Sequence, residues 1–204
     1  MNYELLRDLA DVQTGITLRG PDTSRHDPTG THRLIRIGDV SPEGIISAKS
    51  SSRIKVTAKD AERFELKPGN LLVAARGSRL TAAVFGGDEP AVAGSQFIVI
   101  RILQKSLGLS SGYLSWYLNL PSIQEELATS MRGSYIRSLP ARVLSQLQVP
   151  VPAIAKQQAI AELSHLRIQE KALMNQLSHK RSLLIDQLAT LSINHNPHLH
   201  HVLS

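Results

Sequence analysis

Cysteine is missing from this 204-residue sequence, and aromatic residues are scarce: there are three Phe, four Tyr and one Trp. Without cysteine the chain cannot form a disulfide, a thiolate zinc site or a cysteine nucleophile. The sequence also has no run of eighteen apolar residues, the length that a membrane-spanning helix requires. Its first thirteen residues, MNYELLRDLADVQ, carry acids where a secretion signal would be basic and then apolar. We therefore expect a cytoplasmic protein.

The signatures of several enzyme classes are missing as well. The sequence has no GxxxxGK[ST] loop, no GxSxG elbow and no HExxH motif. Glu65-Leu66-Lys67, with Asp39 or Asp60 upstream, imitates the acid and ExK pattern of metal-dependent nucleases, although Lys67-Pro68-Gly69 also reads as a turn before a strand. We expect no catalytic residues, no metal site and no cofactor held by this chain.

Positive charge exceeds negative charge, with 23 Lys and Arg against 17 Asp and Glu and a net charge of +6. This balance favours a polyanionic partner, nucleic acid first. The cations gather where acids are absent: in residues 49–59, around Arg76 and Arg79, and in residues 132–142. Arginine predominates, and its planar fork suits phosphates and guanine edges. The alternative is that these clusters are solvated surface.

The length allows one ordinary domain with an appendage, and residues 1 to about 105 are predicted to be rich in β-strands. Residues 33–37 and 53–57 alternate between apolar and polar, which is typical of half-buried strands. Residues 71–75 and 96–102 are more continuously apolar, so we expect deeper burial there. Turn sequences separate the strands, at 42–44, 68–70 and 85–88.

From Ser110 onwards the apolar spacing becomes helical. Ser110 is expected to cap a short helix on which Trp116 and Tyr117 serve packing rather than base stacking. Ser122 and Glu125 are spaced as a capping box for a second helix. We expect Gly133 to end that helix and the prolines of residues 147–152 to keep that segment extended.

Residues 156–191 contain neither Gly nor Pro and could form one helix of about 54 Å. A heptad seam runs along it, formed by Leu163, Leu166, Leu173, Leu177, Leu184 and Leu191. Glu170, Lys180 and Gln187 occupy seam positions, where polar residues weaken a coiled coil but specify its register and partner. Such a stripe needs another helix, from a second copy or a different subunit. The alternative is a helix folded back on its own domain.

The order of several short motifs is more specific than any one of them. In chain order these are LLRDL at 5–9, TGI at 14–16, RLIRIGDV at 33–40, EGII at 43–46, LKPGNLLVAARG at 66–77, GS at 133–134, Leu144, VPVP at 149–152 and QQAI at 157–160. This order resembles the DNA specificity (S) subunit of type I restriction–modification systems, with one target recognition domain followed by one conserved long helix. The resemblance extends from about residue 4 to residue 191.

The sequence departs from the family pattern in three respects. Asn70 stands where the family usually has Asp, a change that the turn tolerates because both side chains bond the local backbone. In residues 153–157 the family's proline-leucine and acidic residue are changed. Full-length members carry two recognition domains and two long helices, whereas this sequence has no internal repeat. It therefore resembles a half-length S subunit.

The resemblance implies an α+β fold: a β-rich recognition domain with short helices over residues 1–152, and one long helix over 153–192. Residues 193–204, with His195, His198, His200 and His201, lack a packing pattern; we expect a disordered tail, and metal capture is the alternative. The helices of two copies would pair antiparallel, and the dimer would recognise a two-part palindromic site. Methyltransferase (M) subunits using S-adenosylmethionine would dock on the helices, and a separate restriction (R) subunit, an ATP-dependent motor, would cut.

DNA binding would then come from the basic stretches and from loops in which glycine permits close approach. The candidate DNA-binding residues are Gln13, Thr14, Lys49, Arg53, Lys55, Arg76, Ser78, Arg79, Gln96, Arg132, Ser134, Tyr135 and Arg137. Two alternatives concern single residues: Arg76 could pair with Asp88 or Glu89, and Tyr135 could belong to the core. Two others concern the whole chain, which could be a helical scaffold protein or a sequence-independent DNA binder.

Overall fold

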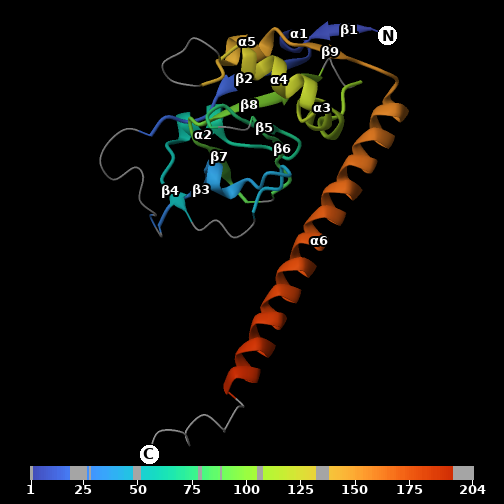
Figure 1. Ribbon diagram of the computed structural model, residues 1–204. Helices are drawn as coiled ribbons and strands as arrows, with labels where there is room; N and C mark the ends of the chain where they lie inside the picture. Colours follow the sequence, from blue (N-terminus) through green and yellow to red (C-terminus); the bar gives the residue numbers. More distant parts are fainter. Residues whose placement is uncertain are drawn as a thin grey trace, which may run out of the picture. The chain divides into compact units, whose positions relative to one another are not determined.

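A computed structural model describes residues 2–18, 27, 29–47, 52–77, 80–87, 89–104, 108–131 and 138–194. Contacts divide the chain into two compact units, Met1–Glu162 and Leu163–Ser204. The first unit is a mixed α/β domain, and the second continues a long helix that begins in the first (Figure 1). The predicted α+β class with a long C-terminal helix is confirmed. The division within the helix differs from the predicted boundary at residue 152, which stays a prediction.

The centre of the domain is a four-stranded antiparallel sheet with the order β2-β8-β5-β6. Its strands are β2 (Ala10–Thr14), β8 (Phe97–Ile102), β5 (Leu71–Ala74) and β6 (Ala82–Val84). Side chains alternate across β5, so that Leu71 and Val73 enter one core while Leu72 and Ala74 enter another. Both faces of the sheet are therefore covered, which confirms the deep burial expected from the two continuously apolar segments.

A second sheet has the order β4-β3-β7, and β3 runs parallel to β7. It consists of β4 (Arg53–Ile54), β3 (His32–Ile35) and β7 (Ala91–Ala93). Strands were expected at 33–37 and 53–57, and both are present but shorter; the half-burial expected of the first is wrong, because all four residues of β3 are buried. β3 ends early because Ile37–Asp39 forms a 3-10 turn, η1, in which the Asp39 carboxylate accepts a bond from the Arg36 N–H at 2.7 Å. Local side-chain bonding there replaces the sheet.

Helices cover the face of the four-stranded sheet that lies away from β3 and β4 (Figure 1). These helices are α1 (Leu6–Leu9), α3 (Ser111–Leu118), α4 (Pro121–Thr129) and α5 (Ala141–Ser145), and α2 (Ala58–Phe64) follows β4. A two-stranded sheet pairs β1 (Tyr3–Leu5) with β9 (Gln148–Pro150), within the segment predicted to be extended. The larger core lies between these helices and the sheet, and it contains Leu114, Leu118 and Leu144 among others.

The aromatic residues of α3 serve packing, as expected. The Tyr113 and Trp116 rings lie 5.6 Å apart. The Tyr113 hydroxyl donates to the Pro150 carbonyl at 2.8 Å, and the Tyr117 hydroxyl donates to the Gln148 carbonyl at 2.9 Å. Burial raises the pKa of both phenols. These bonds hold β9, and with it the approach to the long helix, against α3.

The expected helix caps are correct in one case and wrong in another. Ser110 caps α3, its hydroxyl accepting the Tyr113 N–H at 3.4 Å. The capping box at Ser122 and Glu125 is wrong, because α4 begins at Pro121 and its N-cap, Leu120, makes no side-chain bond. Proline is favoured in the first turn because its missing N–H would have no partner there. Helix α4 ends at Thr129, and Gly133 lies outside the described residues.

The long helix α6 (Ile154–Asn194) has 41 residues; it begins one residue after the predicted start at 153 and ends two residues beyond the predicted end at 192. Its six seam leucines, from Leu163 to Leu191, are between 53% and 68% exposed. The seam is therefore a stripe of exposed apolar surface, which is costly in water. Among the described residues, no helix combines the length and apolar character needed to cross a membrane.

Candidate DNA interface

One end of the four-stranded sheet, here called the loop end, brings together residues that are far apart in the sequence. In the antiparallel register, the last residues of β2 and β5 lie beside the first residues of β8. β2 ends at Thr14, Gln96 directly precedes β8, Arg76 follows β5, and Leu80 precedes β6. Three candidate DNA-binding residues, Thr14, Arg76 and Gln96, therefore lie at the loop end.

Arg76 also pairs with a segment from the helical part of the domain. Arg76 and Ser138 form an isolated antiparallel bridge. Next to it, the Leu139 N–H donates to the Ala75 carbonyl at 2.8 Å, and the Ala75 N–H donates to the Gln96 carbonyl at 2.8 Å. Two segments are expected to read bases, residues 76–79 and 133–137; Arg76 begins the first of them, and Ser138 directly follows the second.

Two side-chain amides bond the outer edge of the sheet at β6 and at Leu80, which precedes it. Gln124 accepts from the Leu80 N–H at 3.2 Å and donates to the Leu80 carbonyl at 3.1 Å. Asn119 likewise bonds both backbone groups of Ala82: it accepts from the Ala82 N–H at 2.9 Å and donates to the Ala82 carbonyl at 2.8 Å. An amide that both accepts and donates replaces the bonds of a neighbouring strand. Sequence reasoning missed both residues, because single amides between two helices form no pattern.

Gly77 directly follows Arg76 and has a positive φ. Its φ is +104°, a value that glycine adopts without the steric penalty of other residues. Arg76 is exposed, and it makes no ion pair with a carboxylate in the described part of the chain. The expected alternative partner Glu89 instead contacts Arg33 and Arg53, while Asp88 lies outside the described residues.

A groove of about 750 Å³ lies between the end of β2, helix α2 and the segment that joins β4 to α2. It brings together Gln13, Thr14 and Lys55. Arg63 and Phe64 of α2 also line it, with the Arg63 guanidinium 5.0 Å from the centre of the Phe64 ring. The Gln13 side chain donates to the Arg63 carbonyl at 3.1 Å. The groove therefore has two cations, Lys55 and Arg63, and one acid, Asp60, beside the polar end of β2.

The charge of Lys55 is partly balanced within the domain. Its ammonium lies 3.6 Å from the Asp27 carboxylate. Hydrogen bonds from Thr29, one from its hydroxyl at 2.7 Å and one from its N–H at 2.8 Å, hold the pKa of Asp27 below the ordinary value. Asp27 is therefore an anion at neutral pH, and it competes with a phosphate for Lys55.

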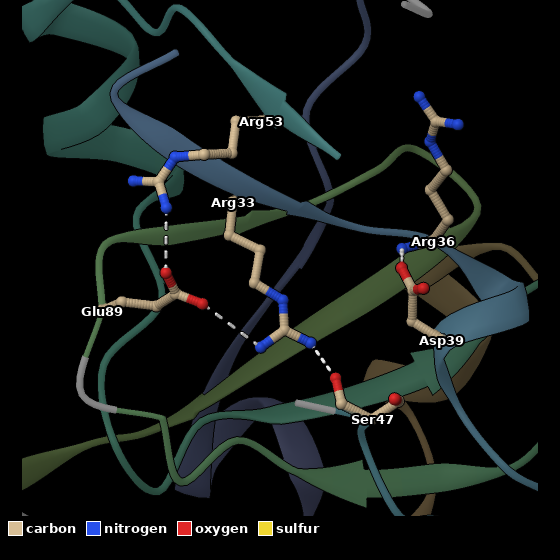
Figure 2. Close-up of polar contacts among 6 residues, drawn as sticks. All are labelled: Arg33, Arg36, Asp39, Ser47, Arg53 and Glu89. Atoms are coloured by element: carbon tan, nitrogen blue, oxygen red, sulfur yellow. Dashed lines mark hydrogen bonds and ion pairs between the residues drawn. The ribbon is translucent and has the colours of Figure 1, made fainter. Parts of the chain in front are cut away.

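Arg53 is part of an ionic cluster centred on Glu89 (Figure 2). Glu89 lies 3.1 Å from the Arg53 guanidinium and 3.5 Å from that of Arg33. Arg33 is buried, and it also donates to the Ser47 carbonyl. The Arg53 Nε donates to the Gly30 carbonyl at 3.2 Å. The cluster stabilises β3 and β4, so a phosphate would have to compete with Glu89 for Arg53.

The remaining candidates fall outside the part of the chain that the structure describes. They are Lys49, Ser78, Arg79, Arg132, Ser134, Tyr135 and Arg137, and the histidines after residue 194 do so as well.

The ExK pattern is part of a turn. Lys67 and Glu65 form an ion pair at 2.8 Å, which lowers the pKa of Glu65. Asn70 accepts from the Lys67 N–H at 2.9 Å, which is the local backbone bond expected of Asn or Asp there. Asp60 bonds Thr57 at the start of α2. Among the described residues no three His, Asp or Glu side chains form a group that could hold a metal ion.

The geometry defines a class of protein: a β-rich domain in which residues from distant segments meet at one end of a sheet, followed by a long helix with an exposed apolar seam. A family model described as the type I restriction modification DNA specificity domain matches residues 4–179. The chain belongs to this family, which confirms the identification from the ordered motifs. This family membership agrees with the prediction that the chain is a specificity protein rather than an enzyme. No curated protein sequence matches the chain significantly.

Solved structures share the fold. A chain from a structure addressing complex assembly and conformational transition of the type I R-M system has a TM-score of 0.67 at 14% identity, over 92% of this chain and 43% of that one. The HsdS subunit from Thermoanaerobacter tengcongensis gives 0.54 at 16% identity, over 85% and 38%. The type I S subunit from M. genitalium gives 0.53 at 21% identity, over 87% and 41%. This chain thus spans about two-fifths of each of the three.

Proposed function

We propose that this chain is the non-catalytic specificity component of a type I restriction–modification system, which recognises DNA bases through the loop end. The observation that carries this proposal is the pairing of Arg76 with Ser138, because it joins two basic loops from distant parts of the sequence. Gln96 lies beside this pair through its bond to Ala75. Side chains of this kind read base edges in the major groove.

The groove beside β2 would hold the DNA backbone. Lys55 and Arg63 are cations on its wall, and Thr14 joins the groove to the loop end. Backbone contacts of this kind position a protein without reading sequence, and they make its affinity dependent on salt. If the groove binds the DNA backbone and the loop end reads bases, substitutions in the two places have different effects. Variants in the groove weaken binding to all DNA, whereas variants at the loop end reduce selectivity.

The long helix would pair with that of a second copy. The exposed leucine seam supports this, since a seam of six leucines is stable only against another apolar surface. A two-fold dimer would recognise an interrupted palindrome, because the symmetry of the site follows that of the protein. M subunits would dock on the helices and use S-adenosylmethionine, and the R subunit would use ATP and cut.

DNA binding is tested with a pool of random duplexes, from which bound sequences are selected and then competed with random DNA. We expect enrichment of one two-part sequence. Arg76→Ala should weaken binding to this sequence at least tenfold relative to binding to random DNA. Arg7→Ala is the matched control, because Arg7 is an exposed arginine beyond the opposite end of β2. A pool without enrichment would instead favour the sequence-independent binder. If the full-length chain bound no DNA of any sequence, the scaffold alternative would gain support.

The dimer is tested by light scattering at several concentrations. We expect a mass close to twice the 22.3 kDa of the chain. A mass of one chain at every concentration would contradict the homodimer. The seam would then be the binding surface for a different subunit, or would fold back on its own domain.

A further inference from the structure

The seam of α6 contains charged residues at two positions where leucine would be expected, and their spacing defines how two copies fit together. Glu170 and Lys180 lie in line with the seam leucines, and both are exposed. We propose that two copies of α6 pair antiparallel about a two-fold axis at the level of Asn175, with Glu170 of each copy facing Lys180 of the other. This inference rests on the proposed homodimer and specifies its register.

In this register the charges match and the four seam leucines nearest the axis meet one another, while Leu163 faces Gln187 and Leu191 faces Ala159. A residue that lies a given number of positions before Asn175 faces the residue equally far after it in the second copy. Leu173 then faces Leu177, and Leu166 faces Leu184. Each layer pairs one seam position of the heptad in one helix with the other seam position in the second helix, as antiparallel helices require. The ion pair forms twice by symmetry, and the long stems of its side chains pack against the leucines.

A parallel arrangement in register brings like charges together. Glu170 would face Glu170 of the second copy, and Lys180 would face Lys180, within the apolar seam. Like charges in contact are destabilising, and their desolvation adds to the cost. The seam therefore favours antiparallel pairing on charge alone.

Antiparallel registers displaced by one heptad are also unfavourable. One displacement places Lys180 against Leu177, and the other places Glu170 against Leu173. In either case an unpaired charge contacts a leucine on both sides of the two-fold axis, and a desolvated charge without a partner is costly. Among these registers the one centred on Asn175 alone satisfies both charges.

Charge reversal tests the ion pair. Glu170→Lys places two cations in each of the two layers, so we expect the dissociation constant of the dimer to rise at least tenfold. Adding Lys180→Glu in the same chain should restore it to within about threefold, and the two single variants should prefer each other when mixed. Asp186→Lys is the matched control, because it makes the same change of charge on the side of the helix away from the seam.

Disulfide formation tests the register independently, and the absence of cysteine makes every introduced thiol unique. Chains with Leu166→Cys mixed with chains with Leu184→Cys should form the mixed disulfide. The combinations of Leu173→Cys with Leu184→Cys, and of Leu166→Cys with Leu177→Cys, report the two displaced registers. Leu166→Cys alone reports parallel pairing.

The outcomes separate the two proposals. A dimer that crosslinks best in a displaced or parallel combination, or in which Glu170→Lys behaves like Asp186→Lys, would overturn the register and leave the homodimer intact. A wild-type chain that stays monomeric at all concentrations would overturn both. Circular dichroism of each variant confirms that the helix is formed.

Discussion

The side-chain amide of Gln157 joins the start of the long helix to the start of α3, its oxygen accepting the Ser110 N–H at 2.9 Å. Its nitrogen donates to the Gly108 carbonyl at 2.6 Å and to the Pro152 carbonyl at 2.8 Å. Gln157 is fully buried, and it belongs to the QQAI motif by which the family was identified. Its position explains why the motif needs an amide there.

Replacing Gln157 by alanine should therefore destabilise the domain. The substitution leaves a buried N–H and two carbonyls without their partner, which costs about 1–3 kcal/mol. Chemical denaturation monitored by tryptophan fluorescence measures the loss. Gln158→Ala is the control, since Gln158 is exposed, and we expect it to change stability by less than about 0.5 kcal/mol. Equal effects of the two substitutions would contradict the anchoring role of Gln157.

Gln124→Ala should reduce DNA selectivity without any change in charge. Gln124 bonds both backbone groups of Leu80, the residue that follows the loop of residues 77–79. Without the amide this edge of the sheet loses its partner, and the loop is less well positioned. We expect a loss of about 1–2 kcal/mol in stability and at least a threefold loss of selectivity in competition binding. The exposed Gln146 supplies the control as Gln146→Ala; selectivity unchanged in Gln124→Ala would refute the link.

Glu89→Ala should lower stability but not DNA affinity. It removes the counter-charge of the buried Arg33, which costs about 1–3 kcal/mol. The cost is lower than for a fully buried ion pair because the Glu89 carboxylate is 42% exposed. It also removes the carboxylate that would compete with a DNA phosphate for Arg53. Glu62→Ala, at an exposed residue of α2, is the control for lost negative charge. If DNA affinity fell in Glu89→Ala alone, the cluster would have to contribute directly to the interface.

Lys67→Met should raise the pKa of Glu65, because the hydrogen bond from Lys67 is the main cause of its lowered value. A carboxyl with a lowered pKa in the folded state stabilises the fold above its unfolded pKa of about 4.3, and that contribution is lost as the pH falls through the folded value. The wild-type domain should thus lose more stability between pH 5 and pH 3 than Lys67→Met does. Titration of the Glu65 carboxyl by NMR measures the shift, and an unchanged pKa would show that the ion pair is absent in solution.

Part of the fold was predictable because it depends on local sequence. The apolar runs at 71–75 and 96–102 predict buried strands, and both lie in the central sheet. The capping box at Ser122 was a wrong prediction because Pro121 competes for the first turn, and a pattern of two residues does not reveal which cap prevails. The strand expected at 33–37 is short because the Asp39 side chain bonds the backbone locally.

The candidate site was predictable as residue types but not as an arrangement. Arg76, Gln96 and Thr14 were selected for their chemistry, and nothing in the spacing shows that they share one end of a sheet. That follows from the strand order β2-β8-β5-β6. Likewise, the involvement of Arg53 in an ion pair depends on Glu89, 36 residues later in the chain.

The sequence by itself determined the long helix and its seam, because helix formation and heptad spacing are local properties of residues 154–194. It also determined the family, through the order of short motifs along the chain. The tertiary structure alone decided which residues meet: Arg76 with Ser138, Gln124 with Leu80, and Gln157 with Ser110. The physical reason is that these pairs are created by strand order and by the burial of amides, which depend on contacts between residues more than forty positions apart.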